Sequence, residues 1–315
     1  MKAFPIYYDF RVAPLTFDFA VFLAIGYGHA KKNGYDTIDV YLIRPYFRRS
    51  NETEVSYKDG YDEWKFQNVI MSLLSITKIL NNIYVVRGGD VELRTPRYPE
   101  DYHPDRVDLS KKISQIPTNF VHLIPLFDSH EKPFIFKSTE TARKWIAAKY
   151  GDFDVCLTLR TAIQKPDRNI NLDDWYELYH EVCKLGLRPV VIPDHDDIFT
   201  EGRFRKYDWD CVEEAGSNLE LRLATYELAS KNISWACGMY TLLFFSGVDF
   251  LIFGKWDDAE VTSSREFLIR KGPSIGTQFS WAHPNRQVID WTERSKLGRI
   301  KLIESAKKYL AGAIY

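Results

Sequence analysis

The chain has 315 residues, more than one typical domain needs, so we expect two α/β domains of roughly 150 residues each. Its 42 Lys and Arg residues balance 43 Asp and Glu residues, which argues against a nucleic-acid-binding protein because such proteins carry a basic surface. The four cysteines form no CxxC pair and every apolar stretch is too short to span a membrane, so we expect a cytoplasmic protein without disulfides or structural zinc.

The first half of the chain alternates strand and helix patterns. Strand patterns cover residues 6–10, 37–43 and 83–86, and helical patterns cover residues 19–27 and 61–80. Strands that alternate with helices indicate a parallel sheet, so residues 1–150 are expected to form a Rossmann-like domain. Within it, residues 96–133 are rich in proline and charge and are expected to form loops. The predicted domain boundary lies at Gly151-Asp152, after a helix over residues 139–150.

A second and clearer α/β series begins after that boundary. Strands are expected over residues 155–159, 189–192, 233–236 and 250–253, with helices over residues 172–185, 217–231 and 241–245. Residues 151–291 are therefore predicted to form a second Rossmann-like domain. Residues 292–315 carry an amphipathic pattern and are expected to form a C-terminal helix that returns to the N-terminal domain.

Basic side chains follow the first strand of the second series. Ligands of open parallel sheets bind beyond the carboxyl ends of the strands, and Arg160 lies there. Its planar guanidinium can bind phosphate through paired hydrogen bonds, and Lys165 and Arg168 lie on the loop that follows. These residues suit a nucleotide diphosphate, and the alternative for Arg160 is a structural ion pair with Asp194 or Asp196.

The segment Gly238-Met239-Tyr240-Thr241 follows the third strand and begins a helix. Because Gly238 has no side chain, a phosphate can approach the backbone N–H groups at this helix start, and the Thr241 hydroxyl can add a hydrogen bond. An ordinary turn is the alternative.

The run Asp194-His195-Asp196-Asp197 follows the second strand. It is open to several interpretations: a divalent-metal site, an acid/base pair that uses His195, an acceptor for a ribose or sugar hydroxyl, or a solvated loop that caps the next segment. Adjacent carboxylates repel and cannot all face one ligand, so no metal site is predicted.

Residues 276–283 fit neither a strand nor a helix. The amide of Gln278 and the neighbouring rings can close over a base or sugar, or the segment can be a simple crossover linker.

The order strand-TLR, strand-PDHDD, helix-LRLATYELASKN, strand-ISWACG and helix-MYTLLFFS resembles the donor half of GT-B glycosyltransferases over residues 151–291. Heptosyltransferase-like and fucosyltransferase-like enzymes are the nearest in pattern, although Thr158 stands where a fucosyltransferase HxR motif has His. The resemblance implies two Rossmann-like domains that face a cleft, with Arg160 and residues 238–241 on the donor diphosphate.

The implied activity is transfer of a sugar from a nucleotide sugar to a glycan or glycolipid, without a metal or other cofactor. An inverting enzyme of this kind needs a base from the N-terminal domain, and Asp9 and Asp18 are the candidates, although Asp18 also suits the first turn of a helix. A nucleotide-sugar epimerase, a non-catalytic nucleotide- or carbohydrate-binding protein, and a phosphatase that uses Asp194 are the alternatives.

Two basic groups bear on a lipid-linked acceptor. Arg44, Arg48 and Arg49 follow the second strand, and the C-terminal helix carries Lys296, Arg299, Lys301, Lys307 and Lys308. If both face anionic lipid, the protein is peripheral at the inner face of a membrane. The alternative is a set of ordinary solvated cations.

Overall fold

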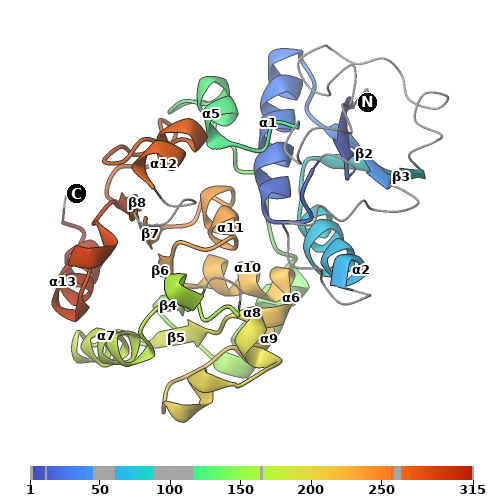
Figure 1. Ribbon diagram of the computed structural model, residues 1–315. Coiled ribbons are helices and arrows are strands. Elements are labelled where there is room, and N and C mark those ends of the chain that lie inside the picture. Colours follow the sequence, from blue (N-terminus) through green and yellow to red (C-terminus); the bar gives the residue numbers. More distant parts are fainter. Residues whose placement is uncertain are drawn as a thin grey trace. The chain divides into compact units, whose positions relative to one another are not determined.

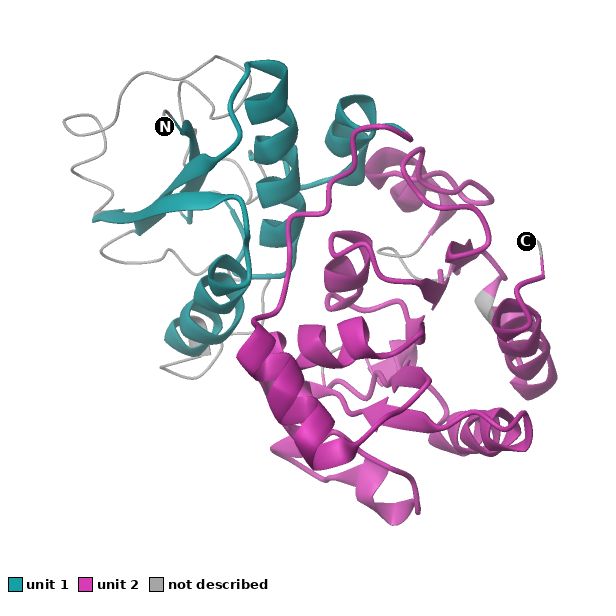
Figure 2. Ribbon diagram, turned by 180° about the vertical axis from the view of Figure 1, so that it is seen from behind, with its two compact units in different colours: residues 1–128 teal, residues 129–315 magenta. Residues whose placement is uncertain are grey.

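The computed structural model describes residues 3–10, 13–44, 61–87, 116–163, 166–254, 256–258 and 264–313. The chain divides into two compact units, residues 1–128 and 129–315 (Figure 2). Lys165, Arg48 and Arg49, which the sequence singles out, lie outside the described residues. No helix in the described part of the chain is long and apolar enough to cross a membrane.

Unit 1 is built on a three-stranded parallel sheet in the order β1-β2-β3. The strands are β1 (Phe4–Asp9), β2 (Ile38–Arg44) and β3 (Leu80–Arg87). Among its described residues the helices are α1 (Asp18–Lys32), α2 (Tyr61–Lys65), the π-helical turn η1 (Phe66–Met71), α3 (Ser72–Ser75), α5 (Phe120–Leu123) and the 3-10 turn η3 (Ile124–Leu126).

Aromatic rings pack together in the core of unit 1. The ring of Tyr8 on β1 packs edge-on against Phe19 and Phe22 of α1, with centroid distances of 4.7 and 4.9 Å. Helix α1 also passes close to η3, where a Cβ on Gly28 would lie 2.8 Å from the Cβ of Leu126. Glycine is therefore needed at this crossing.

Unit 2 contains a five-stranded parallel sheet in the order β5-β4-β6-β7-β8. The strands are β4 (Val155–Thr158), β5 (Pro189–Ile192), β6 (Lys231–Trp235), β7 (Phe250–Phe253) and β8 (Gln287–Asp290). The chain passes outward from β4 to β5 and then returns across β4 to β6. The order of the strands therefore reverses between β4 and β6, which is where doubly wound sheets bind their ligands.

Helices cover both faces of this sheet (Figure 1). They are α6 (Glu140–Tyr150), α7 (Leu172–Lys184), α8 (His195–Ile198), α9 (Glu213–Ser217), α10 (Leu219–Leu228), α11 (Tyr240–Phe244), α12 (Arg265–Lys271) and α13 (Arg299–Leu310), with the 3-10 turns η4 (Pro166–Arg168), η5 (Arg203–Lys206) and η6 (Arg294–Lys296). Trp175 and Leu178 of α7 and Tyr309 of α13 share one core with the strands. Helices α6, α9 and α10 pack against one another in a separate layer.

The compact units divide after Asp128, so helix α6, which packs against α10, falls in unit 2. Helix α13 packs against α7 within the same unit.

The predicted helix over residues 217–231 is observed as α10, which begins after Asn218 and ends at Leu228, before β6 begins at Lys231, and the separate short helix α9 precedes it. Asn218 has an extended backbone, and its side chain accepts hydrogen bonds from the N–H groups of Glu220 and Leu221, 3.0 Å each. A side chain that caps a helix in this way stabilises a new start and interrupts the helix before it.

Candidate functional site

The loops after β4, β5 and β6 lie at one edge of the unit 2 sheet because the three strands are parallel. They carry Arg160, Asp194 and the turn that begins at Cys237, respectively. The reversal between β4 and β6 places the first and third of these loops beside the expected ligand crevice.

Arg160 and Arg168 form the basic part of this edge. Arg160 is only 7% exposed, and its Nη1 donates to Oδ1 of Asn169. Burial lowers the pKa of Arg160, and the nearby positive charge of Arg168 lowers the pKa further. Two guanidinium groups that repel each other in a partly buried place are stabilised by an anion between them.

A hydrogen bond to its backbone carbonyl fixes the position of Arg168. The indole N–H of Trp235, at the end of β6, donates to the carbonyl oxygen of Arg168 at 3.0 Å. The Nε of Arg168 is buried and has no hydrogen-bond partner among the described residues. An unpaired buried donor costs about 1–3 kcal/mol, which a ligand oxygen can recover.

Thr161, directly after Arg160, is fixed from both sides. Its N–H donates to Oδ2 of Asp194 at 3.2 Å, and its carbonyl oxygen accepts from Nη2 of Arg203 at 2.7 Å. Arg203 is in turn held by the fully buried carboxylate of Asp197, with Nε 3.1 Å from Oδ1. The hydroxyl of Thr161 is buried and has no partner within the described part of the chain. The loop therefore presents a second polar atom that is positioned but unpaired.

Asp194 and Asp196 attach the loop after β5 to the loop after β4. Asp194 also caps α8, since its Oδ1 accepts from the N–H of Asp196 at 3.1 Å. Oδ2 of Asp196 accepts from the N–H of Ile163 at 2.9 Å. This arrangement corresponds to the capping interpretation of the Asp194-His195-Asp196-Asp197 run. No cluster of side chains that could hold a metal ion occurs among the residues that the structure describes.

Burial shifts the pKa of two residues of this run. It raises the pKa of Asp194 above the ordinary value and lowers the pKa of His195 below 6.5. His195 is therefore neutral at pH 7, and its ring lies 4.9 Å from that of Phe199. A neutral imidazole does not contribute positive charge to an anion site.

The turn at residues 238–241 uses its own polar groups. The N–H groups of Tyr240 and Thr241 donate to the carbonyl oxygens of Cys237 and Gly238 at 3.2 and 3.4 Å. The Thr241 hydroxyl donates to the Gly238 carbonyl oxygen at 3.0 Å, and Met239 is the residue that precedes helix α11. These groups are therefore engaged within the turn, and α11 has only five residues.

Gln278 lies beside the edge strand β8. Its amide donates to the carbonyl oxygen of Ile289 at 2.8 Å and accepts from the N–H of the same residue at 2.7 Å. The side chain thus pairs with a strand edge as a neighbouring strand would, which blocks edge-to-edge association. Both halves of the amide are used in this way.

Asp9 and Asp18 lie in unit 1. Asp9 is the last residue of β1 and is completely buried. Asp18 is the exposed first residue of α1, and its Oδ2 accepts from the Thr16 hydroxyl at 3.0 Å.

Sequence reasoning missed several residues that shape this edge, chiefly Thr161, Asn169, Arg203 and Trp235. Thr161 follows Arg160 and Asn169 follows Arg168, so their places in the sequence next to predicted binding residues could have identified them. Arg203 lies more than 40 positions from Thr161, whose carbonyl it holds, and no local pattern links the two.

Solved structures resemble the whole chain. The structure of E. coli ADP-heptose lps heptosyltransferase II matches with 9% sequence identity and a TM-score of 0.56, covering 99% of each chain. A glycosyl transferase family 9 protein from Veillonella parvula matches with 11% identity and a TM-score of 0.54, covering 98% of this chain and 97% of the other. No protein-family model and no curated protein matches the sequence. The predicted GT-B-like α/β fold is therefore confirmed.

Proposed function

We propose that the protein is a glycosyltransferase that takes its sugar from a nucleotide-sugar donor. Two glycosyltransferases share its fold over nearly the whole chain, and the name of one contains ADP-heptose. At such low identity the fold allows several chemistries, so the argument depends on the residues of the site.

The observation that carries the proposal is the group formed by Arg160, Thr161 and Arg168. Two guanidiniums, a buried unpaired Nε and a buried unpaired hydroxyl lie on one segment where the strand order reverses. A diphosphate has the charge and the acceptor oxygens that such a group lacks. The segment also includes Lys165, which we propose as a further cation on the same ligand.

The same residues offer a way to stabilise the leaving group. When the glycosidic bond to the donor breaks, negative charge develops on the departing diphosphate, and fixed guanidiniums can stabilise it. We propose transfer without a metal ion, because the carboxylates of Asp194 and Asp196 accept hydrogen bonds from backbone N–H groups. Treatment with EDTA should then leave activity unchanged, whereas a complete loss that manganese or magnesium restores would contradict this part.

For the base of an inverting reaction, we propose Asp18 in preference to Asp9. Asp18 is exposed and can reach an acceptor hydroxyl, whereas Asp9 is completely buried. Asp18→Asn should lower kcat by about 100-fold or more, as expected of a lost general base, and leave nucleotide affinity unchanged. Equal kcat values for the variant and the wild type would remove Asp18 from the reaction.

The acceptor that we propose is a glycan or glycolipid. The name of the E. coli heptosyltransferase with the same fold includes lps, and this supports an acceptor of that kind. We do not extend the proposal to a membrane surface, because Lys296, Arg299 and Lys307 form ion pairs with Glu293, Asp174 and Glu181. Cations neutralised in this way attract anionic lipid weakly.

Calorimetric titration with UDP, GDP, CMP and ADP tests the proposal. At least one nucleotide should bind, and at about 100 times its Kd it should stabilise the fold by about 2.7 kcal/mol. Arg168→Gln should weaken that binding by roughly 1.5–3 kcal/mol, the contribution of a charge-assisted hydrogen bond.

Arg188→Gln is the matched control, since Arg188 is a half-exposed arginine of the same unit that contacts Asp210 and the carbonyl oxygen of Asp152. Failure of all four nucleotides to bind, or equal affinity in Arg168→Gln and wild type, would overturn the proposal. Nucleotide binding without transfer to any acceptor would favour a nucleotide-binding protein.

A further inference from the structure

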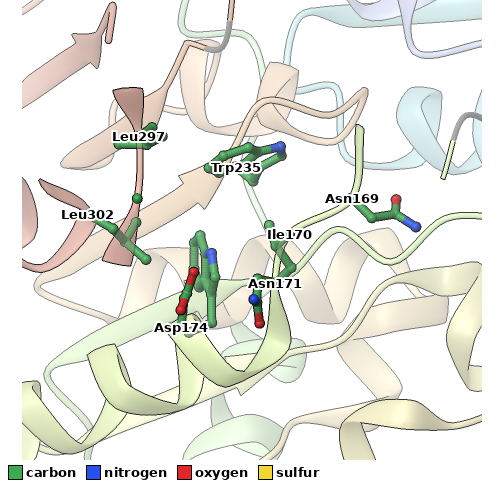
Figure 3. A pocket seen from close by; sticks show the side chains of 9 residues that line it. Asn169, Ile170, Asn171, Asp174, Trp235, Leu297 and Leu302 are labelled. Atoms are coloured by element: carbon green, nitrogen blue, oxygen red, sulfur yellow. The ribbon is translucent and has the colours of Figure 1, made fainter. Parts of the chain in front are cut away.

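A cavity of about 140 Å³ lies in unit 2 where α7 and α13 begin (Figure 3). Asn171 and Asp174 come from the start of α7, Trp235 from the end of β6, and Leu302 from α13. The remaining lining residues are Asn169, Ile170, Trp175, Leu297 and Gly298. A cavity of about 150 Å³ is known to hold benzene, so this one has room for a six-membered ring.

The walls combine apolar surface with polar groups. In Figure 3, Trp235 lies across the pocket from Asp174 and Asn171, while Leu297 and Leu302 close another side. The indole of Trp235 is itself fixed, because its N–H donates to the carbonyl oxygen of Arg168. The cavity thus has rigid flat and apolar walls against which the carbon face of a ring can pack.

Two donors on these walls are unpaired. Trp175 is 1% exposed, and its indole N–H has no partner among the residues that the structure describes. Asn171 uses its Oδ1 to accept from the N–H of Asp173 at 2.9 Å, and its Nδ2 has no partner in the same described set. Because Trp175 is almost fully buried and lines the cavity, a ligand there can accept its hydrogen bond.

An acceptor lies beside these donors. The Oδ1 of Asp174 is 2.7 Å from Nε of Arg299, which leaves lone pairs of the carboxylate for further hydrogen bonds. Because Arg299 offsets the charge of this carboxylate, the cavity has no net charge to attract an ionic ligand, and a purely apolar ligand would leave the N–H groups unpaired. A hydroxyl group both donates and accepts, so a polyhydroxylated ring satisfies the carboxylate and the N–H groups together.

We propose that this cavity binds a neutral monosaccharide unit, with Trp175 and Asn171 donating to its oxygens and Asp174 accepting from its hydroxyls. The cavity adjoins the diphosphate group, because Asn169 and Trp235 line it and also contact Arg160 and the Arg168 carbonyl oxygen. The Asn169 amide points away from the other labelled side chains in Figure 3, so the proposed sugar contacts come from other residues. The inference is argued from the cavity walls and their donors, without the proposed transferase activity.

Saturation-transfer NMR with glucose, galactose, mannose and N-acetylglucosamine, each titrated into the full chain to about 100 mM, tests the proposal. At least one sugar should bind saturably. Trp175→Phe keeps an aromatic ring but removes the indole N–H, and Asn171→Ser removes the amide but keeps an oxygen that can cap α7. Each should weaken sugar binding by about fivefold, as one lost hydrogen bond predicts.

The controls remove the same groups elsewhere in unit 2. Trp209→Phe deletes a buried indole N–H that is unpaired within the described structure and lies outside the cavity, and Asn218→Ser alters the cap of α10. Both should bind sugar as the wild type does. If Trp175→Phe does not fold, the sugar affinity of Asn171→Ser compared with that of Asn218→Ser tests the proposal.

Three outcomes would overturn the proposal. The first is that none of the four sugars binds saturably. The second is that the controls lose affinity as much as the cavity variants. The third is that Trp175→Phe and Asn171→Ser weaken nucleotide binding and a nucleotide displaces the sugar, because the cavity would then hold the nucleotide base. Arg168→Gln should weaken nucleotide binding and leave sugar binding unchanged, so failure of the diphosphate proposal can be distinguished from failure of the sugar proposal.

Discussion

Arg222 shows how much of the site depends on one buried side chain. It is completely buried on α10, and its guanidinium donates to the carbonyl oxygens of Pro193 and Ala215 at 3.1 and 2.9 Å. It also donates to the hydroxyl of Tyr226 at 3.2 Å. Since Pro193 precedes Asp194, Arg222 supports the loop that holds Thr161.

Replacement of Arg222 should therefore destabilise the fold strongly. Arg222→Leu leaves several buried carbonyl oxygens unpaired, and we expect a loss of about 3–5 kcal/mol, as for other broken buried polar networks. Arg222→Lys should recover only part of this, because an ammonium lacks the planar fork. Urea unfolding measures both, with Arg188→Leu as an exposed control, and a loss below about 1 kcal/mol for Arg222→Leu would show that the network is dispensable.

Gly216 is required by packing in the same region. A Cβ at this position would lie 2.1 Å from Cδ1 of Ile198 and 3.1 Å from the Pro193 carbonyl oxygen. We expect Gly216→Ala to cost about 1–3 kcal/mol, as overpacked core sites do.

Gly298→Ala is the matched comparison, because no atom lies within 4 Å of its added Cβ and the backbone has an ordinary φ of -85°. It should change stability only slightly, because alanine restricts the unfolded chain but is a poorer N-cap residue than glycine at the start of α13. Thermal melts of the two variants measure the difference. Equal melting temperatures would mean that Ile198 moves aside at no cost.

At the scale of elements, ion pairs join α13 to α7. Glu181 on α7 is paired with Lys307 on α13 and with Lys184 on its own helix. Hydrogen bonds from these two lysines lower the pKa of Glu181 to about 2 from an ordinary value of 4.5. Because the folded pKa is the lower one, these contacts contribute stability above about pH 4.5 and lose it as the pH falls towards 2.

Glu181→Gln should accordingly melt below the wild type near pH 6 by a small margin, since exposed ion pairs contribute little. The difference in Tm should shrink as the pH is lowered towards about 2, where the wild-type carboxylate is protonated. Glu304→Gln, an exposed change on α13 itself, should show no such dependence. A difference that stays constant with pH would mean that Glu181 acts through packing.

At the scale of the molecule, unit 2 has what an independent domain needs. It has its own five-stranded sheet, helices on both faces and a continuous core that includes α13. The diphosphate group and the cavity both lie within it.

A fragment of residues 129–315 is therefore expected to fold alone and unfold in one cooperative transition. Its nucleotide affinity should lie within about threefold of that of the full chain, because the proposed donor residues are all present. Circular dichroism melts and calorimetric titration test this. A fragment without a cooperative melt would show that unit 1 is needed for the fold of unit 2.

The sequence by itself determined most of the order of strands and helices, but it predicted neither the edge strand β8 nor the short helices α8 and α12. Apolar runs such as residues 189–192 and 250–253 were placed at their observed bounds, because a buried parallel strand is a local pattern of apolar residues. The sequence also indicated that Arg160 and Arg168 lie at the carboxyl edge of a sheet.

Only the tertiary structure decided which polar groups are already used. The carboxylates of the Asp194-His195-Asp196-Asp197 run accept hydrogen bonds from Thr161, Ile163 and Arg203, which the fold brings to them. The amide of Gln278 is likewise taken by Ile289. A hydrogen bond between residues distant in sequence depends on how strands and helices pack, and no local pattern records it.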